Sequence, residues 1–157
     1  MTAKWMRRST YASENELYRD QRVAPADQKI LEETLVLYDR IRGLHGGPLL
    51  INSGRRSAEK QEELRKAGYR AAKFSPHVWG CALDVRVPEG KTDEYLVALL
   101  FGGAQLLGYD MPRVGWRNYR NGKSSSTFVH FDFAYLLPLE SIPMGARKAW
   151  LVRGLTW

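Results

Sequence analysis

The chain has 157 residues, of which 44% are hydrophobic, and it carries a formal net charge of +7. This length is enough for one compact domain with a hydrophobic core and too short for two ordinary domains, so we expect a single domain over residues 1–157. No stretch approaches the roughly 18 consecutive apolar residues of a membrane span, and a single cysteine excludes an intramolecular disulfide framework.

The positive charge is uneven along the chain. Residues 48–74 and 111–157 are net basic, whereas residues 75–110 are net acidic. A basic surface suits a polyanion such as a cell-wall polymer or a nucleic acid, or it serves only solubility. Because no nucleic-acid-binding motif accompanies the charge, we expect no nucleic-acid partner.

The first ten residues are basic, but no apolar run of signal-peptide length follows them. We therefore expect a protein that is made in the cytoplasm without a signal peptide.

Helices and short strands alternate through the first half of the chain. Apolar residues recur at helical spacing from about Asp27 to Gly43, which predicts the first helix. Residues 49–52 predict a buried strand. Ser57 suits the N-cap of a second helix, which is expected to end just before Gly68.

The second half is predicted to hold three strands and one helix. The strands cover Ala82–Val87, residues 113–116 and residues 127–133, the last two separated by a polar loop. Thr92 is expected to cap a helix that Gly108 stops. The apolar face of this helix is predicted to contain Leu96, Leu99, Leu100 and Leu106. Late strands that form hairpins among helices favour an α+β fold over a doubly wound α/β fold.

Two histidines and a carboxylate stand in short motifs far apart in the sequence. His77 and Asp84 are seven residues apart across a glycine turn that leads into a predicted strand, and His130 lies on the last predicted strand. Two imidazoles and one carboxylate from separate elements would leave a tetrahedral zinc ion one open position, as a catalytic metal needs. These residues indicate a candidate zinc hydrolase. The remaining histidine, His45, is interpreted as a surface residue without a role.

Strand alternation makes this hypothesis testable. If Asp84 faces the metal, Ala82 and Arg86 share its face. The side chains of opposite parity then point into the core, namely those of Cys81, Leu83 and Val85. We therefore interpret Cys81 as a buried thiol and not as a ligand. On the last strand, His130 and Asp132 share one face, and the residues predicted to pack behind them are Val129, Phe131 and Phe133.

Three motifs together resemble a known family. The pattern S-x-H-x-x-G-x-A-x-D is matched without a gap from Ser75 to Asp84, the residues Ser53-Gly54-Arg55-Arg56-Ser57 are similar to S-G-x-R-S, and residues 128–132 read F-V-H-x-D. This combination resembles the M15 zinc peptidases, which are D-alanyl-D-alanine carboxypeptidases and peptidoglycan endopeptidases. The resemblance extends from about residue 27 to residue 135 and leaves residues 136–157 as a C-terminal tail.

The resemblance implies a small, mostly antiparallel sheet with helices packed on it, as in hedgehog-like and D-Ala-D-Ala peptidase folds. It also implies one zinc ion (Zn2+) bound by His77, Asp84 and His130.

For substrate binding, the resemblance implies that Arg56 holds a carboxylate or carbonyl group near the metal, with a structural salt bridge as its alternative. Arg55 stands where the family usually has tyrosine. Ser75 is expected near the site, with a loop-capping role as its alternative. Trp79 and Trp116 flank the motif and the late loop, so we expect them to contact substrate.

The general base is the point at which this sequence departs from the family. Many members carry an acid three residues before the last histidine ligand, whereas this chain has Thr127 there. The nearest acid is Asp132, which is either the catalytic base or a residue that orients the imidazole of His130; we favour the orienting role.

The predicted function is hydrolysis of an amide bond in peptidoglycan stem peptides or cross-bridges by a monomeric zinc peptidase. The missing export signal indicates a phage or prophage endolysin that reaches the wall by holin-type release. The alternative is a non-catalytic, zinc-stabilised module for wall binding or virion assembly.

Overall fold

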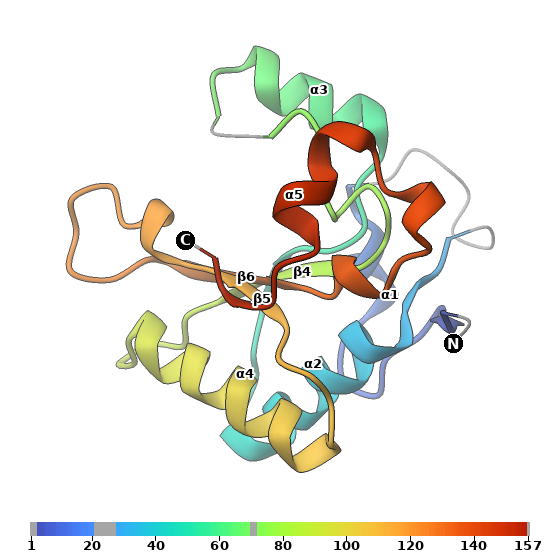
Figure 1. The fold of residues 1–157 in the computed structure, drawn as a ribbon. Helices are drawn as coiled ribbons and strands as arrows, with labels where there is room; N and C mark the ends of the chain where they lie inside the picture. Colours follow the sequence, from blue (N-terminus) through green and yellow to red (C-terminus); the bar gives the residue numbers. More distant parts are fainter. Residues whose placement is uncertain (1–2, 21–27, 70–71, 157) are drawn as a thin grey trace.

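A computed structural model describes residues 3–20, 28–69 and 72–156 (Figure 1). Its centre is a five-stranded sheet in which all neighbouring strands are antiparallel except the last pair, β5 and β7. The strands, in their order across the sheet, are β3 (Ile51–Ser53), β4 (Ala82–Arg86), β6 (Phe128–Asp132), β5 (Arg113–Gly115) and β7 (Gly154–Leu155). A mostly antiparallel sheet with packed helices confirms the predicted α+β class.

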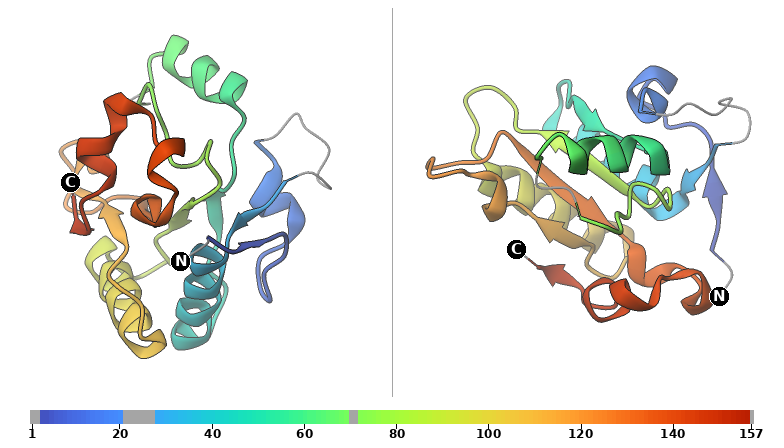
Figure 2. Two further views of the ribbon diagram at one scale, coloured as in Figure 1. Left: turned by 45° about the vertical axis from the view of Figure 1, so that its right-hand side comes forward. Right: turned by 90° about the horizontal axis from the view of Figure 1, so that it is seen from above.

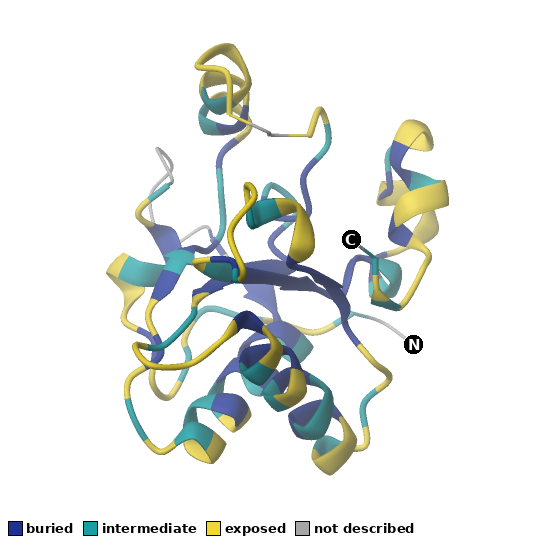
Figure 3. Cartoon of the chain, turned by 90° about the vertical axis from the view of Figure 1, so that its left-hand side faces the viewer, coloured by how far each residue is buried: buried dark blue, intermediate teal, exposed yellow. Residues whose placement is uncertain are grey.

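Two long helices cover one face of the sheet. α2 (Glu32–His45) and α4 (Asp93–Leu107) pack side by side beneath it (Figures 1 and 2). Thr92 caps α4 by accepting the amide hydrogen of Tyr95, and Gly108 ends it in a left-handed conformation, as the sequence predicts. Figure 3 shows buried residues on both helices where they lie against the sheet. The fully buried leucines of the two helices include Leu35, Leu37, Leu96 and Leu100. Leu106 was expected on this face and is exposed instead, so that expectation is wrong.

The opposite face of the sheet lies below α3 (Ala58–Lys66) and the C-terminal segment (Figures 1 and 2). Ser57 caps α3 by accepting the amide hydrogen of Lys60. The C-terminal segment contains α5 (Arg147–Trp150), and it contributes Leu137, Ile142, Ala146 and Trp150 to the hydrophobic core. The short 3-10 helices are η2 (Arg117–Tyr119), η3 (Ala134–Leu136), η4 (Leu139–Ser141) and η5 (Met144–Ala146).

The N-terminal region contains elements that the sequence analysis does not predict. β1 (Trp5–Met6) pairs with β2 (Ile30–Leu31), and α1 (Glu14–Tyr18) begins at a capping box formed by Ser13 and Glu16. The first predicted helix therefore begins too early, because Ile30 and Leu31 form a strand and the helix starts at Glu32. Its expected start at Asp27 lies outside the described residues.

The predicted alternation of β4 and β6 is confirmed. Asp84 lies opposite His130, and Ala82 lies opposite Asp132, so these four side chains share one face. The side chains predicted to point into the core are all buried, namely Cys81, Leu83, Val85, Val129, Phe131 and Phe133. None of the described helices is both long and apolar enough to cross a membrane.

Gly80 has a backbone conformation that a larger residue would strain. Its φ is +71°, and a Cβ atom there would meet the Arg55 guanidinium and lie 2.7 Å from the carbonyl oxygen of Lys29. We expect Gly80→Ala to lower the free energy of unfolding by about 1–3 kcal/mol in urea titrations. Gly43→Ala is the control, because a Cβ there meets nothing within 4 Å and alanine favours the helix. An equal loss in both variants would contradict this reason.

Candidate metal centre

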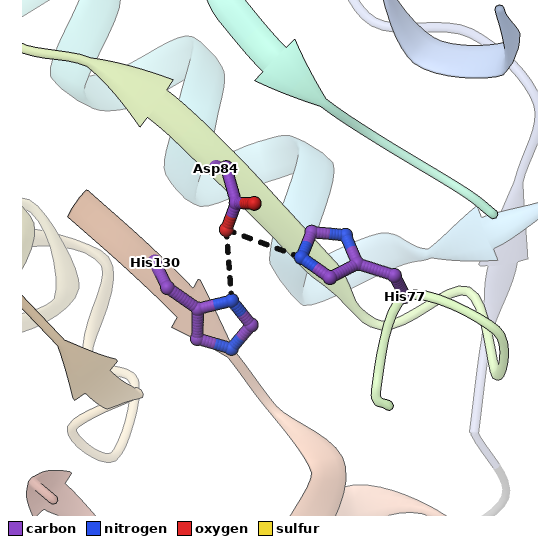
Figure 4. A group of neighbouring side chains, drawn as sticks. All are labelled: His77, Asp84 and His130. Atoms are coloured by element: carbon purple, nitrogen blue, oxygen red, sulfur yellow. Dashed lines mark hydrogen bonds and ion pairs between the residues drawn. The ribbon is translucent and has the colours of Figure 1, made fainter. Parts of the chain in front are cut away.

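Three potential ligands meet on the sheet face below α3. Asp84 and His130 are cross-strand partners on β4 and β6, and His77 comes from the turn that precedes β4. One donor atom from each residue lies within 4.8 Å of the others, and Figure 4 shows the Asp84 carboxylate between the two imidazoles. The histidines are 3% and 4% exposed. The structure thus brings together the three ligands that the sequence predicts, and this group could hold a metal ion.

Each imidazole has an inner nitrogen, which faces Asp84, and an outer nitrogen, which faces away from Asp84. The outer nitrogen of each ring is held by an oxygen acceptor. Nδ1 of His77 lies 2.7 Å from the carbonyl oxygen of Gly54, and Nε2 of His130 lies 2.7 Å from Oδ2 of Asp132. Because these oxygens only accept, the outer nitrogens carry the hydrogen, and in a neutral ring the inner nitrogen carries a lone pair. Such second hydrogen bonds are the usual way in which metal-binding histidines are oriented.

Both inner nitrogens face the same carboxylate oxygen. Oδ1 of Asp84 lies 3.1 Å from Nε2 of His77 and 2.9 Å from Nδ1 of His130. Three lone pairs that converge in a buried space repel one another unless a proton or a cation lies among them. The donor set therefore fits a cation, and two nitrogens with one carboxylate oxygen are ligands that zinc accepts.

The pKa shifts show how the group behaves before it binds metal. Burial lowers the pKa of His77, and the Asp84 carboxylate only partly opposes this effect. Burial also disfavours a charged His130, but its hydrogen bonds to Asp132 and Asp84 outweigh this and raise its pKa to about 9. Burial would raise the pKa of Asp84, yet the two histidines hold it well below its usual range. A metal ion would therefore replace a proton on His130 while Asp84 is already ionised.

The turn that carries His77 is held by its own hydrogen bonds. Oγ of Ser75 accepts the amide hydrogen of His77 at 3.4 Å, and the carbonyl oxygen of Ser75 accepts that of Val78 at 2.9 Å. The carbonyl oxygen of His77 accepts amide hydrogens from Gly80 and from Arg56. Ser75 therefore has the loop-capping role given as its alternative, and because it also lines the site cavity, substrate contact by Ser75 stays a prediction.

The two adjacent arginines point to different places. Arg56 donates to Gln61 at 2.6 Å and to Ser53 at 2.8 Å, and its Nη2 lies 4.0 Å from Oδ2 of Asp84. Its Nε is buried and has no hydrogen-bond partner among the described residues. Arg55 instead donates to the carbonyl oxygen of Lys29, away from the ligands. The structure therefore places the second arginine beside the candidate metal site.

A cavity of about 920 Å³ opens over the three ligands. Its walls come from α3 with the segment that follows it, from the loop between β5 and β6, and from the C-terminal segment around α5. Thr127, which occupies the family's usual base position, is exposed and lines this cavity. Asp132 is completely buried behind His130, where its Oδ1 accepts the amide hydrogen of Ala134 at 2.9 Å.

Neither predicted tryptophan is among the described residues that line the cavity. Nε1 of Trp79 donates to the carbonyl oxygen of Ser141, and its ring packs edge-on against Trp150, with 5.3 Å between ring centroids. Trp116 is buried, and two guanidinium groups stack on its ring. Contact of Trp79 and Trp116 with substrate stays a prediction.

Cys81 and His45 lie outside the candidate metal site and contribute to packing and to contacts between helices. Cys81 is fully buried, and burial raises the pKa of its thiol well above the usual value, so it is protonated. Nδ1 of His45 lies 2.7 Å from the hydroxyl oxygen of Tyr95. This contact connects the end of α2 with α4, which is a role that the sequence analysis does not assign to His45.

Several residues that shape the site are missed by the sequence analysis. Ser53 and Gly54 belong to the S-G-x-R-S motif, but their contacts with Arg56 and His77 depend on how that loop folds. Gln61 follows the Ser57 cap by four residues, so the sequence predicts that it lies on the helix. The sequence does not predict that its side chain accepts from Arg56.

The sheet, its helices and the buried His-Asp-His group define an α+β protein with a candidate metal centre, and one solved structure is similar to it. This is the crystal structure of the Serratia marcescens L-Ala D-Glu endopeptidase ChiX, with a TM-score of 0.51 and 21% identity. The match covers 69% of this chain and 85% of ChiX. No model of a known protein family matches the chain, and a search of curated proteins finds no significant match. The chain therefore has the fold of that endopeptidase.

Proposed function

We propose that this protein is a zinc peptidase of the M15 type that hydrolyses an amide bond in the peptides of peptidoglycan. The observation that carries the proposal is the convergence of His77, Asp84 and His130 in a large cavity, with both outer imidazole nitrogens held by acceptors. The fold shared with a peptidoglycan endopeptidase supports the substrate class. The phage endolysin source stays a prediction.

The chain's own residues have distinct tasks in this mechanism. Zinc bound there would lower the pKa of a water molecule and polarise the scissile carbonyl group. Gly54 and Asp132 keep the imidazoles in the tautomers that present lone pairs to the metal. Arg56, held by Ser53 and Gln61, presents its guanidinium to a substrate carbonyl or carboxylate group.

Digestion of purified sacculi tests this function. Zinc-loaded protein is expected to release peptides, and mass spectrometry of the new ends identifies the bond that is cleaved. The chelated protein is the matched control and is expected to release none. Absence of new ends with zinc-loaded protein that retains its fold would overturn the proposal.

A second function is favoured by one observation. Among the described residues that line the cavity, Asp84 is the only one with a carboxylate, and the family's base position is Thr127. A zinc-stabilised module that binds the wall without cleaving it would need no base. Sedimentation of the protein with sacculi, without release of peptides, is the result that this second candidate predicts.

Arg56→Lys tests the proposed substrate contact. Lysine keeps the charge but loses the planar fork, so we expect kcat/KM to fall about tenfold, equivalent to about 1.4 kcal/mol, while zinc content stays at the wild-type value. Arg55→Lys is the matched control, because Arg55 contacts the carbonyl oxygen of Lys29 and not the ligands. Loss of activity in Arg55→Lys alone would show that the assignment of the two arginines is reversed.

A further inference from the structure

Arg113 is a second buried arginine at the candidate metal centre. It is the first residue of β5, it pairs with Asp132 in the register, and it is 3% exposed. Cross-strand partners share a face, so Arg113 lies on the side of the sheet that carries Asp84 and His130. It also lines the site cavity.

The order of the strands places the two ligands of the sheet between two guanidinium groups. Arg56 follows β3, Asp84 lies on β4, His130 on β6 and Arg113 on β5, and these strands are neighbours in that order. Arg56 approaches the carboxylate of Asp84 to 4.0 Å, and Arg113 approaches that of Asp132 to 3.7 Å. A substrate that lies across the strands over the metal would therefore meet a cation on each side.

The charge of the cavity favours an anionic ligand. Its described lining contains three cationic side chains, those of Arg56, Lys73 and Arg113, and one carboxylate, that of Asp84. A divalent ion bound by Asp84 would make the space more positive still. Beside protein walls that displace part of the water, this excess of positive charge attracts an anion more strongly than it would in bulk water.

Asp132 has its hydrogen bonds without Arg113. Its Oδ2 accepts from His130 at 2.7 Å, and its Oδ1 accepts from the amide of Ala134 at 2.9 Å. The 3.7 Å between Nε of Arg113 and Oδ1 is an ion-pair distance that is too long for a hydrogen bond. Arg113 therefore adds positive charge at this side of the cavity without completing the hydrogen bonds that orient His130.

Resting on the peptidase function proposed above, we propose that Arg113 binds a substrate carboxylate on the β5 side of the metal, opposite Arg56. The substrate is then an acidic peptide with a free carboxylate next to its scissile amide. A D-glutamyl residue that is linked through its side chain carries such a group. The guanidinium fork matches a carboxylate through two parallel hydrogen bonds, which lysine cannot provide.

Two synthetic stem peptides test this inference. They are identical except that the D-glutamyl residue carries either its free α-carboxylate or the corresponding carboxamide. We expect zinc-loaded wild-type protein to prefer the acid about tenfold or more in kcat/KM and in calorimetric affinity. Arg113→Gln should remove the preference by weakening the acid alone, and Arg113→Lys should keep only part of it. Arg153→Gln is the control, since Arg153 is an exposed arginine that pairs with Asp110, and it should keep the preference.

The other outcomes separate this inference from the proposed function. If Arg113→Gln weakens both peptides equally or loses zinc, Arg113 is structural and the inference is overturned. The inference is also overturned if wild-type protein has the same kcat/KM and affinity for the two peptides, or binds neither of them. This holds even if the protein digests sacculi. The protein could instead bind the peptide with the free carboxylate in an Arg113-dependent manner and cleave neither peptide. That result would support the carboxylate site and contradict the peptidase function.

Discussion

His77→Ala and Asp84→Ala should each abolish both zinc binding and peptide release. Wild-type protein is expected to hold about one zinc ion per chain, because three ligands suffice for a catalytic site and the fourth position is open to water. Loss of one ligand leaves two donors in a buried space, and elemental analysis after dialysis measures the lost metal. Failure of the wild-type protein to take up zinc, even on titration, would contradict the assignment of the metal site.

Cys81→Ser provides the control for these ligand variants. Cys81 is next to the ligand strand and sulfur is a good zinc donor, but its thiol is fully buried and donates to the carbonyl oxygen of Pro76 at 3.4 Å. Serine preserves a donor for this contact, so the variant should retain zinc and activity. Loss of zinc from Cys81→Ser would show that the side-chain alternation of β4 differs from the structure.

Zinc should also stabilise the fold. The ligands come from two strands of the sheet and from the turn before β4, and an ion that binds only the folded state adds stability according to its concentration relative to Kd. The melting temperature of wild-type protein should therefore rise with zinc, whereas that of His77→Ala should not.

The site was largely predictable because its residues stand in short sequence motifs. His77 and Asp84 occur with Gly80 in one motif, and the positive φ of Gly80 shows why the turn requires glycine. Strand alternation then places Asp84 on one face and Cys81 in the core, which follows from the period of a strand alone. The helices capped by Ser57 and Thr92 were equally predictable, since capping is a local interaction.

The features that the sequence did not predict depend on contacts between distant segments. Ile30 and Leu31 fit a helical apolar pattern, but pairing with β1 makes them a strand. The position of Arg113 beside Asp132 follows from the register of β5 against β6, and the sequence of a three-residue strand does not reveal its register. Leu106 follows Leu99 by seven residues and so has the apolar spacing of α4, yet it is 63% exposed.

Asp132→Asn should weaken zinc binding by about 10–100-fold and leave kcat near wild type at saturating zinc. The Asp132 carboxylate accepts from two donors, Nε2 of His130 through one oxygen and the amide of Ala134 through the other. Asparagine has one acceptor oxygen, so its NH₂ group must face one of these donors, and the ring of His130 loses its fixed tautomer or its orientation. Competition with a chelator of known affinity measures the change in Kd.

The same variant decides whether Asp132 is the general base. A base would touch the attacking water, and its removal would lower turnover by about 10²–10⁴-fold without changing the metal affinity. Asp132 instead lies behind His130, is completely buried, and is not among the described residues that line the cavity. Asp110→Asn is the matched control, since Asp110 is an exposed carboxylate paired with Arg153, and it should change neither quantity. If Asp132→Asn retained its zinc affinity and lost turnover, Asp132 would be the general base and not an orienting residue. Water would then have to reach the side of His130 on which Asp132 lies.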